Sequence, residues 1–562
     1  MSLFYGLILS LLSASQPSSS DPGLILEGAL VYVSAVSRPQ KRDILVRDGK
    51  IAFVGDGAQA RRMAPGAARV DLAGSFVFPG WADAHGHLAG LGQALEVADL
   101  RGAASAGEAA RRIGAIAAGL PAGSWAQGRG WDQNRWPGEK FPDARDLDLV
   151  LPERPVIARR VDGHAVWVNS AALKAASVGA ATRDPEGGRI LRRADGSPSG
   201  VLVDRAVDLV QSVMPRASLA DFERQILAAA KACAKVGLTE VQDASHYGPE
   251  EIAALAKLAD AGLLPIRIYA TVSNEPKDLT GFFARGQRIG GGSDFLTVRA
   301  IKVLADGALG SRGAALLSDY SDDPGNRGLL VTQPDRVNQV AREARQHGWQ
   351  LWIHAIGDRG NRLALDAFAG AAAALPEAPA GARRPRIEHA QVLALDDIPR
   401  FAREGVIASV QPTHATSDMP WAQERVGSER IAGAYAWRQL KNAGARLAGG
   451  SDFPVESENP LAGFYAAVTR QDLEGNPPGG WRPQEKLTRK EALALFTSDA
   501  AYAAFEEDRR GRIAPGFEAD LTVFARDPMA AAEREIPRVP VVLTLVGGKV
   551  AYGQGLASGK VP

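Results

Sequence analysis

The alternation of short apolar runs with helical segments constrains the fold of this chain more than any other feature of its sequence. Helical patterns separate most of eight strand-like runs, which lie at residues 76–84, 237–243, 266–272, 298–305, 350–356, 386–390, 406–411 and 446–451. Eight strands that alternate with helices are what a parallel (β/α)8 barrel requires. We therefore predict an α/β protein whose main unit, residues 79–506, is a TIM barrel.

Capping motifs mark the starts of two of the expected helices. Ser218 with Asp221 precedes a segment with helical spacing, and Gly237 follows as its stop signal. Thr488 with Glu491 caps the segment KEALALFTSDAAYAAF in the same way. Both motifs predict helices that begin directly after the cap.

The interval between the first two strand-like runs is too long for a single crossover. It holds about 150 residues, far more than one crossover helix needs. We therefore expect an inserted subdomain after the first strand, at about residues 95–215.

Both ends of the chain are rich in strand signals. Near the N-terminus, Asp48-Gly49 is a hairpin turn between two apolar runs, and near the C-terminus Gly547-Gly548 has the same place within VVLTLVGGKVAYG. We predict a small composite β-sandwich that residues 24–78 and 507–562 build together.

The first residues are typical of an export signal. An apolar run, Phe4 to Leu12, is followed by the small residues Ser13, Ala14 and Ser15. The run is shorter than the roughly 20 residues that cross a bilayer, and no Lys or Arg precedes it. We expect residues 1–20 to be a signal peptide of a periplasmic or secreted protein; the alternative is a hydrophobic tail on a cytoplasmic enzyme. No other stretch approaches the length of a membrane span.

Charge and cysteine content exclude several classes of protein. The 65 Lys and Arg nearly balance the 64 Asp and Glu, so no basic excess supports nucleic-acid binding. Cys233 is the only cysteine, which excludes an internal disulfide and a cysteine metal cluster.

Six polar residues stand at or near the ends of the predicted barrel strands. They are His85, His87, Lys302, His354, His389 and Asp452. All strands of a parallel barrel end at one face, where such folds keep their active sites, so we expect these side chains to converge. Imidazole and carboxylate groups together suit Zn²⁺ and similar divalent metals.

His85 and His87 are two positions apart, and Lys302 lies in an apolar strand. Alternate residues of a strand point to the same side, so both histidines would face the barrel interior. For Lys302 two interpretations stay open. It pairs with a carboxylate such as Asp306, or it carries CO2 as a carbamate that bridges two metal ions.

Four further residues are candidates for substrate binding. His414 is either a substrate donor or a histidine satisfied within its loop. Asp132 and His164 lie in the insertion. Either the insertion folds over the barrel mouth and brings them to the substrate, or they pack inside the insertion. Arg312 holds a substrate carboxylate or pairs with Asp306 or Asp319. In contrast, His246 and His347 have the positions of structural or exposed histidines.

The chain resembles the amidohydrolase superfamily, and within it the amidohydrolase family 3 group with its N-substituted formamide deformylase-like and AepA-like members. The resemblance rests on FPGWADAHGHL, GRGWDQNRW, HAVWVNSAAL, IKVLADGALGSRGAAL, IHAIGDRGNRLALDAF, RIEHAQVL, SVQPTHA, GGSDFPVE and GRIAPGFEADLTVF, which extend over nearly the whole chain.

The resemblance implies a (β/α)8 barrel, a composite β-sandwich and one or two divalent metal ions, commonly Zn²⁺. By it, His85 and His87 bind the first metal, and His354 and His389 bind the second. Lys302 bridges as carboxylysine, and Asp452 contacts the first metal and acts as the base.

The expected function is hydrolysis of a non-peptide C–N bond in a small molecule, such as an amide, formamide or cyclic amide. Lactonase, esterase or phosphotriesterase activity on the same metal site is the alternative among enzymes. A catalytically silent binding or regulatory protein is the alternative from another class. The barrel and sandwich surfaces would also allow a homodimer.

Overall fold

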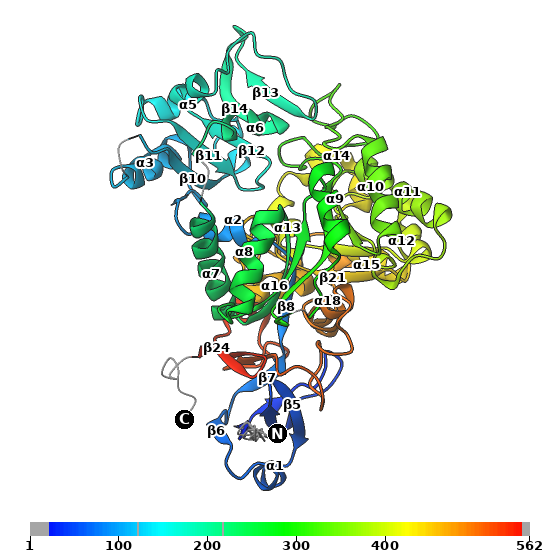
Figure 1. The fold of residues 1–562 in the computed structure, drawn as a ribbon. Coiled ribbons are helices and arrows are strands. Elements are labelled where there is room, and N and C mark those ends of the chain that lie inside the picture. Colours follow the sequence, from blue (N-terminus) through cyan, green and yellow to red (C-terminus); the bar gives the residue numbers. More distant parts are fainter. Residues whose placement is uncertain (1–21, 121–122, 216–217, 291, 554–562) are drawn as a thin grey trace, which may run out of the picture.

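The computed structural model of the protein describes residues 22–120, 123–215, 218–290 and 292–553. The segment predicted as a signal peptide lies outside these residues. Figure 1 shows a barrel in the middle, with a β-sandwich at one end and an inserted subdomain at the other. No helix in the described part of the chain has the length and apolar character needed to cross a membrane.

Eight parallel strands form the central sheet in chain order, which confirms the predicted (β/α)8 barrel. The strands are β8 (Trp81–Gly86), β15 (Leu238–Tyr247), β16 (Arg267–Val272), β17 (Leu296–Leu304), β18 (Gln350–Ala355), β19 (Arg386–His389), β20 (Ile407–Val410) and β21 (Arg446–Gly449). The sheet closes where β21 meets β8. There, Ser451 N donates to the Asp83 carboxylate and Asp452 N donates to His85 O at 2.7 Å.

Helices surround this barrel on its outer side (Figure 1). The main ones are α7 (Leu219–Lys235), α8 (Pro249–Asp260), α9 (Pro276–Arg285), α10 (Pro334–Gln346), α11 (Asp358–Ala374), α12 (Ile398–Glu404), α15 (Trp437–Asn442), α16 (Pro460–Thr469), α17 (Arg489–Leu495) and α18 (Ser498–Ala503). Capping boxes begin α7 at Ser218 and α17 at Thr488, as predicted. The second segment is two helices rather than one, because the chain leaves helical geometry at Thr497.

Short helices and the insertion lie on the side where the strands end. The helices α2 (Leu88–Ala94), α13 (Pro412–Asp418) and α14 (Ala422–Arg430) follow barrel strands. The insertion is a six-stranded sheet of β9 (Ala98–Asp99), β10 (Ala126–Trp131), β11 (Val156–Arg160), β12 (Ala165–Val168), β13 (Gly188–Arg192) and β14 (Pro198–Asp204). The helices α3 (Ala106–Ala117), α4 (Ala144–Asp148), α5 (Ser170–Ala175) and α6 (Asp208–Gln211) accompany it. Trp131 is fully buried in its core, so this residue packs within the insertion.

Two sheets at the opposite end pack their apolar faces together. One contains β1 (Leu24–Glu27), β4 (Asp43–Arg47), β5 (Lys50–Gly55) and β6 (Ala68–Asp71), with α1 (Gly57–Met63) beside it. The other joins both chain ends: β2 (Leu30–Val31), β3 (Gln40–Lys41), β7 (Phe76–Pro79), β22 (Leu521–Phe524), β23 (Val541–Val546) and β24 (Lys549–Gly553). The expected hairpin turns lie between β4 and β5 and between β23 and β24.

The run at residues 76–84 is two strands rather than one. Its first part, β7, belongs to the sandwich, and its second part, β8, begins the barrel. Gly80 separates them, and a Cβ atom there would lie 2.3 Å from Thr239 Oγ1. The chain therefore passes from the sandwich to the barrel at Gly80, where a larger residue would clash.

Candidate metal centre

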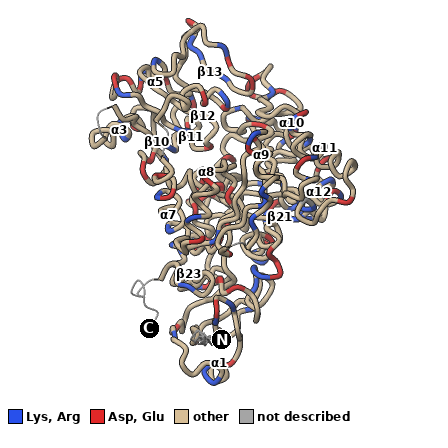
Figure 2. The backbone as a smooth tube through the Cα atoms, viewed as in Figure 1, with Lys and Arg blue, Asp and Glu red and all other residues tan. Residues whose placement is uncertain are grey.

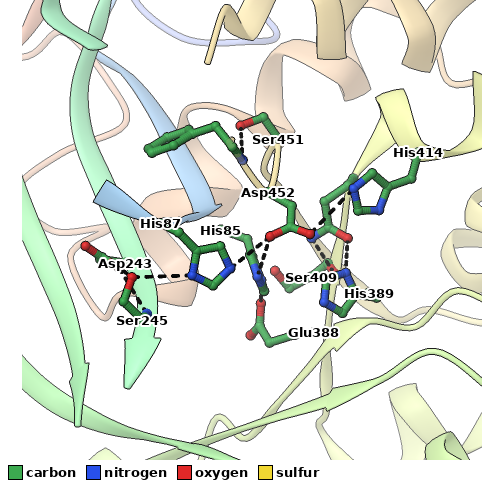
Figure 3. Close-up of polar contacts among 12 residues, drawn as sticks. His85, His87, Asp243, Ser245, Glu388, His389, Ser409, His414, Ser451 and Asp452 are labelled. Carbon is green, nitrogen blue, oxygen red and sulfur yellow. Dashed lines mark hydrogen bonds and ion pairs between the residues drawn. The ribbon is translucent and has the colours of Figure 1, made fainter. Parts of the chain in front are cut away.

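The barrel strands bring His85, His87, His389 and Asp452 together at their C-terminal ends (Figure 3). His85 lies on β8, His354 on β18 and His389 on β19, and the other members follow strands directly. The ring centres of His85 and His389 are 4.8 Å apart, and those of His354 and His389 are 4.6 Å apart. Residues separated by hundreds of positions thus form one cluster.

Asp452 is the shared member of two groups of candidate metal ligands. One group is His85, His87 and Asp452, and the other is His389, His414 and Asp452; the ligand atoms of each lie within 4.8 Å of one another. Asp452 Oδ1 is 2.9 Å from His87 Nε2 and 3.4 Å from His85 Nε2, while Oδ2 is 3.6 Å from His414 Nε2. The sequence leaves His414 open between a substrate donor and a histidine satisfied within its loop, whereas the structure puts it in a group of candidate metal ligands.

Each of three histidines uses its Nδ1 to donate outward. His85 Nδ1 donates to Glu388, His389 Nδ1 donates to Gln411 Oε1 at 2.8 Å, and His87 Nδ1 lies 3.3 Å from Ser245 Oγ. Such partners fix the tautomer and leave the Nε2 lone pair free for a metal. We did not predict these partners, although Glu388 and Gln411 both belong to strand ends that the sequence marks.

Two buried ring nitrogens make the centre a good fit for a cation. Within the described residues, His85 Nε2 and His414 Nε2 are buried and have no hydrogen-bond partner. Buried polar atoms normally have a partner, and a lone pair that lacks one is what a metal ligand requires.

Protonation states at the centre also suit metal binding. Burial lowers the pKa of His87, His354 and His389, so these rings are neutral. Burial disfavours the charged form of Asp452, but the neighbouring imidazoles of His85 and His87 outweigh it and hold the pKa of this carboxyl well below its usual range. Metal ligands have to be deprotonated in this way.

His85 has the opposite shift. Burial and the charge of Lys302 lower its pKa, but the carboxylates of Glu388 and Asp452 outweigh them and raise it above its ordinary value. A metal at His85 would therefore compete with a proton.

Lys302 lies on β17 and is 2% exposed. Among the described residues, no carboxylate oxygen lies within ion-pair distance of its Nζ. Asp306 instead accepts backbone N–H groups of Ala315, Ile356 and Gly357, so the proposed pairing with Asp306 was wrong. Burial lowers the pKa of Lys302 to about 8.

A cavity of about 1040 Å³ opens over this centre, and barrel loops and the insertion both line it. The sequence candidates Asp132, His164 and His414 line the cavity. Asp132 pairs with Arg160 at 2.6 Å. His164 Nδ1 donates to Asp204 at 2.7 Å, and although burial opposes it, this contact raises the pKa of His164 to about 9.

The structure corrects the expectation for Arg312 and agrees with the expectation that His246 and His347 are exposed. Arg312 is not among the cavity-lining residues and pairs with Asp322 at 2.9 Å, rather than with Asp306 or Asp319. His246 is the last residue but one of β15, is exposed and lines the cavity, a position at the site that its sequence context did not indicate. His347 stacks on Phe283 with a ring separation of 4.1 Å at the end of α10.

A (β/α)8 barrel with histidines and an aspartate at its strand ends defines the class of metal-dependent hydrolases. The chain belongs to the amidohydrolase family, whose model matches residues 68–552. This finding confirms the resemblance drawn from the sequence motifs.

Individual relatives cover nearly the whole chain. The putative amidohydrolase YtcJ of Bacillus subtilis (strain 168) is 33% identical over 94% of this chain and 99% of its own length. The N-substituted formamide deformylase of Arthrobacter pascens is 28% identical over 91% of this chain and 94% of its own length. An uncharacterized metal-dependent hydrolase from Pyrococcus horikoshii OT3 has a similar structure, with a TM-score of 0.73, 28% identity and coverage of 91% and 99% of the two chains. The chain is therefore a hydrolase of the metal-dependent type.

Proposed function

We propose that the protein hydrolyses a non-peptide C–N bond of a small molecule at the cluster around Asp452. The observation that carries this proposal is the shared position of Asp452, whose two oxygens lie near two separate groups of histidines. The similarity to an N-substituted formamide deformylase supports an amide or formamide as the substrate class.

Zn²⁺ is the metal we propose, held by His85, His87, His354, His389 and Asp452. Neutral imidazoles with one carboxylate are a donor set that Zn²⁺ favours. When bound, such an ion supplies Lewis acidity and a lowered pKa for water.

Asp452 would act as the general base. Its depressed pKa keeps it ionised at neutral pH, and its side chain is still 9% exposed and lines the cavity. It would take a proton from the attacking water and return it to the leaving nitrogen.

His164 would act as a hydrogen-bond donor to the substrate. The pKa of His164, about 9, keeps its ring protonated at neutral pH, and its ring centre lies 5.1 Å from that of His354. A cation at this place would stabilise negative charge on the carbonyl oxygen.

Lys302 would carry CO2 as a carbamate. The reaction needs a neutral amine, and a pKa of about 8 makes that form accessible. The carbamate would replace a buried unpaired cation, which is costly, with an anionic ligand.

A substrate panel tests the proposal. The Zn²⁺-loaded protein is assayed against matched chromogenic amides, lactones and phosphotriesters. Amide turnover that exceeds the other two classes supports C–N bond hydrolysis. Preference for lactones or phosphotriesters would replace it with the corresponding activity, and absence of turnover on every class would contradict it.

A further inference from the structure

Two arginines of the insertion lie side by side in the wall of the cavity. Arg129 on β10 is directly opposite Arg159 on the parallel strand β11. Opposed residues of neighbouring strands point to the same side of the sheet, with backbones about 4.8 Å apart. Both arginines line the cavity that also contains His85, His87 and Asp452.

Neither guanidinium has an anionic partner. In the ranges that the structure describes, no carboxylate lies within 4.0 Å of either one. Their contacts are to backbone carbonyls: Arg159 Nη1 donates to Gly163 O at 3.0 Å, and Arg129 Nη2 donates to Val161 O at 3.4 Å. Arg129 Nε is buried and unbonded within the described chain.

The neighbouring Arg160, in contrast, has carboxylate partners. It bonds to Asp132 at 2.6 Å and to Asp162 at 2.5 Å. The same strand therefore carries one neutralised guanidinium and one that is left open to the cavity.

Placing two like charges together is unfavourable unless a ligand compensates them. Burial, and then the charge of Arg159, lower the pKa of Arg129 to about 10. Burial also lowers the pKa of Arg159. Both remain protonated at neutral pH, so the pair is a fixed dication that an anion would stabilise.

We propose that Arg129 and Arg159 bind a carboxylate group of the substrate while its scissile bond lies at the metal centre. This inference rests on the proposed function: the proposed function specifies the C–N bond that is cleaved, and the inference adds that the same substrate carries a negative charge. Arg129, Arg159 and Asp452 line the same cavity, so a ligand in it can reach both the pair and the centre. Planar guanidinium groups match a carboxylate with two parallel hydrogen bonds.

The surrounding charges favour a single negative charge over a phosphate dianion. Of the insertion's carboxylates in the cavity lining, Asp132 and Asp162 pair with Arg160 and Asp204 pairs with His164. Asp208 is left as a negative charge near Arg159, and it would repel a second charge on the ligand. Over the whole molecule, basic and acidic residues are interspersed (Figure 2).

Two compounds that differ in one group test the proposal. They are 4-(formamidomethyl)benzoate and the analogue with a methyl group in place of the carboxylate. Binding is measured by calorimetry on the Asp452→Asn chain, where hydrolysis is expected to stop, and turnover is measured on the metal-loaded wild type. We expect the carboxylate compound to bind at least about 10-fold more tightly, a ratio in the range of charge-assisted hydrogen bonds.

Variants assign this preference to the pair. Arg129→Gln and Arg159→Gln should each lower the ratio by about 10-fold. Arg189→Gln is the matched control, because Arg189 is exposed on β13 of the same sheet and does not line the cavity. Circular dichroism and metal content show whether each variant is folded.

The outcomes separate this inference from the proposed function. Tight binding of the carboxylate compound without hydrolysis would support the arginine site and contradict the formamide chemistry. Hydrolysis of both compounds with equal affinities would support the chemistry and overturn the arginine site. A preference that survives both Gln substitutions would also overturn it, and if a variant does not fold, the wild-type affinity ratio decides.

Discussion

Glu388→Gln tests whether the partner of His85 controls metal binding. Glu388 is fully buried and accepts from His85 Nδ1 and from Arg386 Nε at 2.8 Å. Glutamine keeps the shape but has one acceptor oxygen and one NH2 group. If the NH2 group faces His85, the ring must carry its proton on Nε2, which then cannot bind a metal. If the oxygen faces His85, the NH2 group opposes the donors of Arg386.

The structure sets the size of both effects. Removing one partner of a buried ion pair costs about 3–5 kcal/mol of unfolding free energy. Arg386 keeps Gln242, Ala84 O and Ser409 as acceptors, so we expect the lower end, about 3 kcal/mol. Loss of such a partner lowers metal affinity by about 10–100-fold.

Chelator competition, with metal counted by mass spectrometry, measures the affinity, and urea unfolding of the metal-free chain measures stability. Glu507→Gln is the control, because Glu507 pairs with Arg384 at 2.6 Å, with its side chain 29% exposed and away from the cavity. That change should cost at most about 1 kcal/mol and leave metal affinity unchanged. A folded Glu388→Gln chain that binds metal as tightly as the wild type would refute the reasoning.

Three further predictions concern the base, the lysine and the pH dependence of stability. Asp452→Asn should lower kcat by about 10²–10⁴-fold while mass spectrometry finds most of the metal retained; wild-type turnover would exclude Asp452 as the base. Lys302→Arg cannot form a carbamate, so metal content in bicarbonate buffer should fall from about two ions per chain to one or fewer, and an unchanged count would contradict the bridge. Burial, and then the charge of Glu506, raise the pKa of Glu240 to about 8 against the opposing charge of Arg510. The folded chain thus holds a proton that the unfolded chain releases near pH 4.5, and stability from this group is lost as pH rises toward 8. Glu240→Gln has no such loss, so its urea midpoint relative to wild type should increase from pH 5 to pH 8; a constant difference would contradict this assignment.

The strand order and the main members of the cluster could be predicted because they depend on local patterns. Apolar runs, capping boxes and turn glycines each depend on a few neighbouring residues. A parallel barrel then places every strand end at one face, so His85 and His389 converge whatever the loops do.

Other features depend on contacts that the sequence does not record. Whether Asp306 would meet Lys302 or backbone amides depends on how the loop after β17 folds. The pairing of Arg312 with Asp322 also depends on how this loop folds. The opposition of Arg129 and Arg159 requires the register of two strands in the insertion, which single-strand patterns do not fix.

The sandwich that joins both chain ends has a consequence for synthesis of the protein. The strands β1, β4, β5 and β6 can pair as soon as residues 24–71 are made, and β7 can pair with β2, but its other neighbour, β22, is made much later. Trp81 N bonds to Thr522 Oγ1, 441 residues away along the chain. Until the last strands leave the ribosome, Phe78 and Trp81 lack Phe524, the aromatic neighbour that helps to bury them. A nascent chain with such exposed apolar surface is prone to aggregate. A late stop codon that removes β22 would therefore leave Phe78 and Trp81 without this neighbour in an otherwise complete barrel. The loss of solubility would be larger than the loss of a few strands suggests.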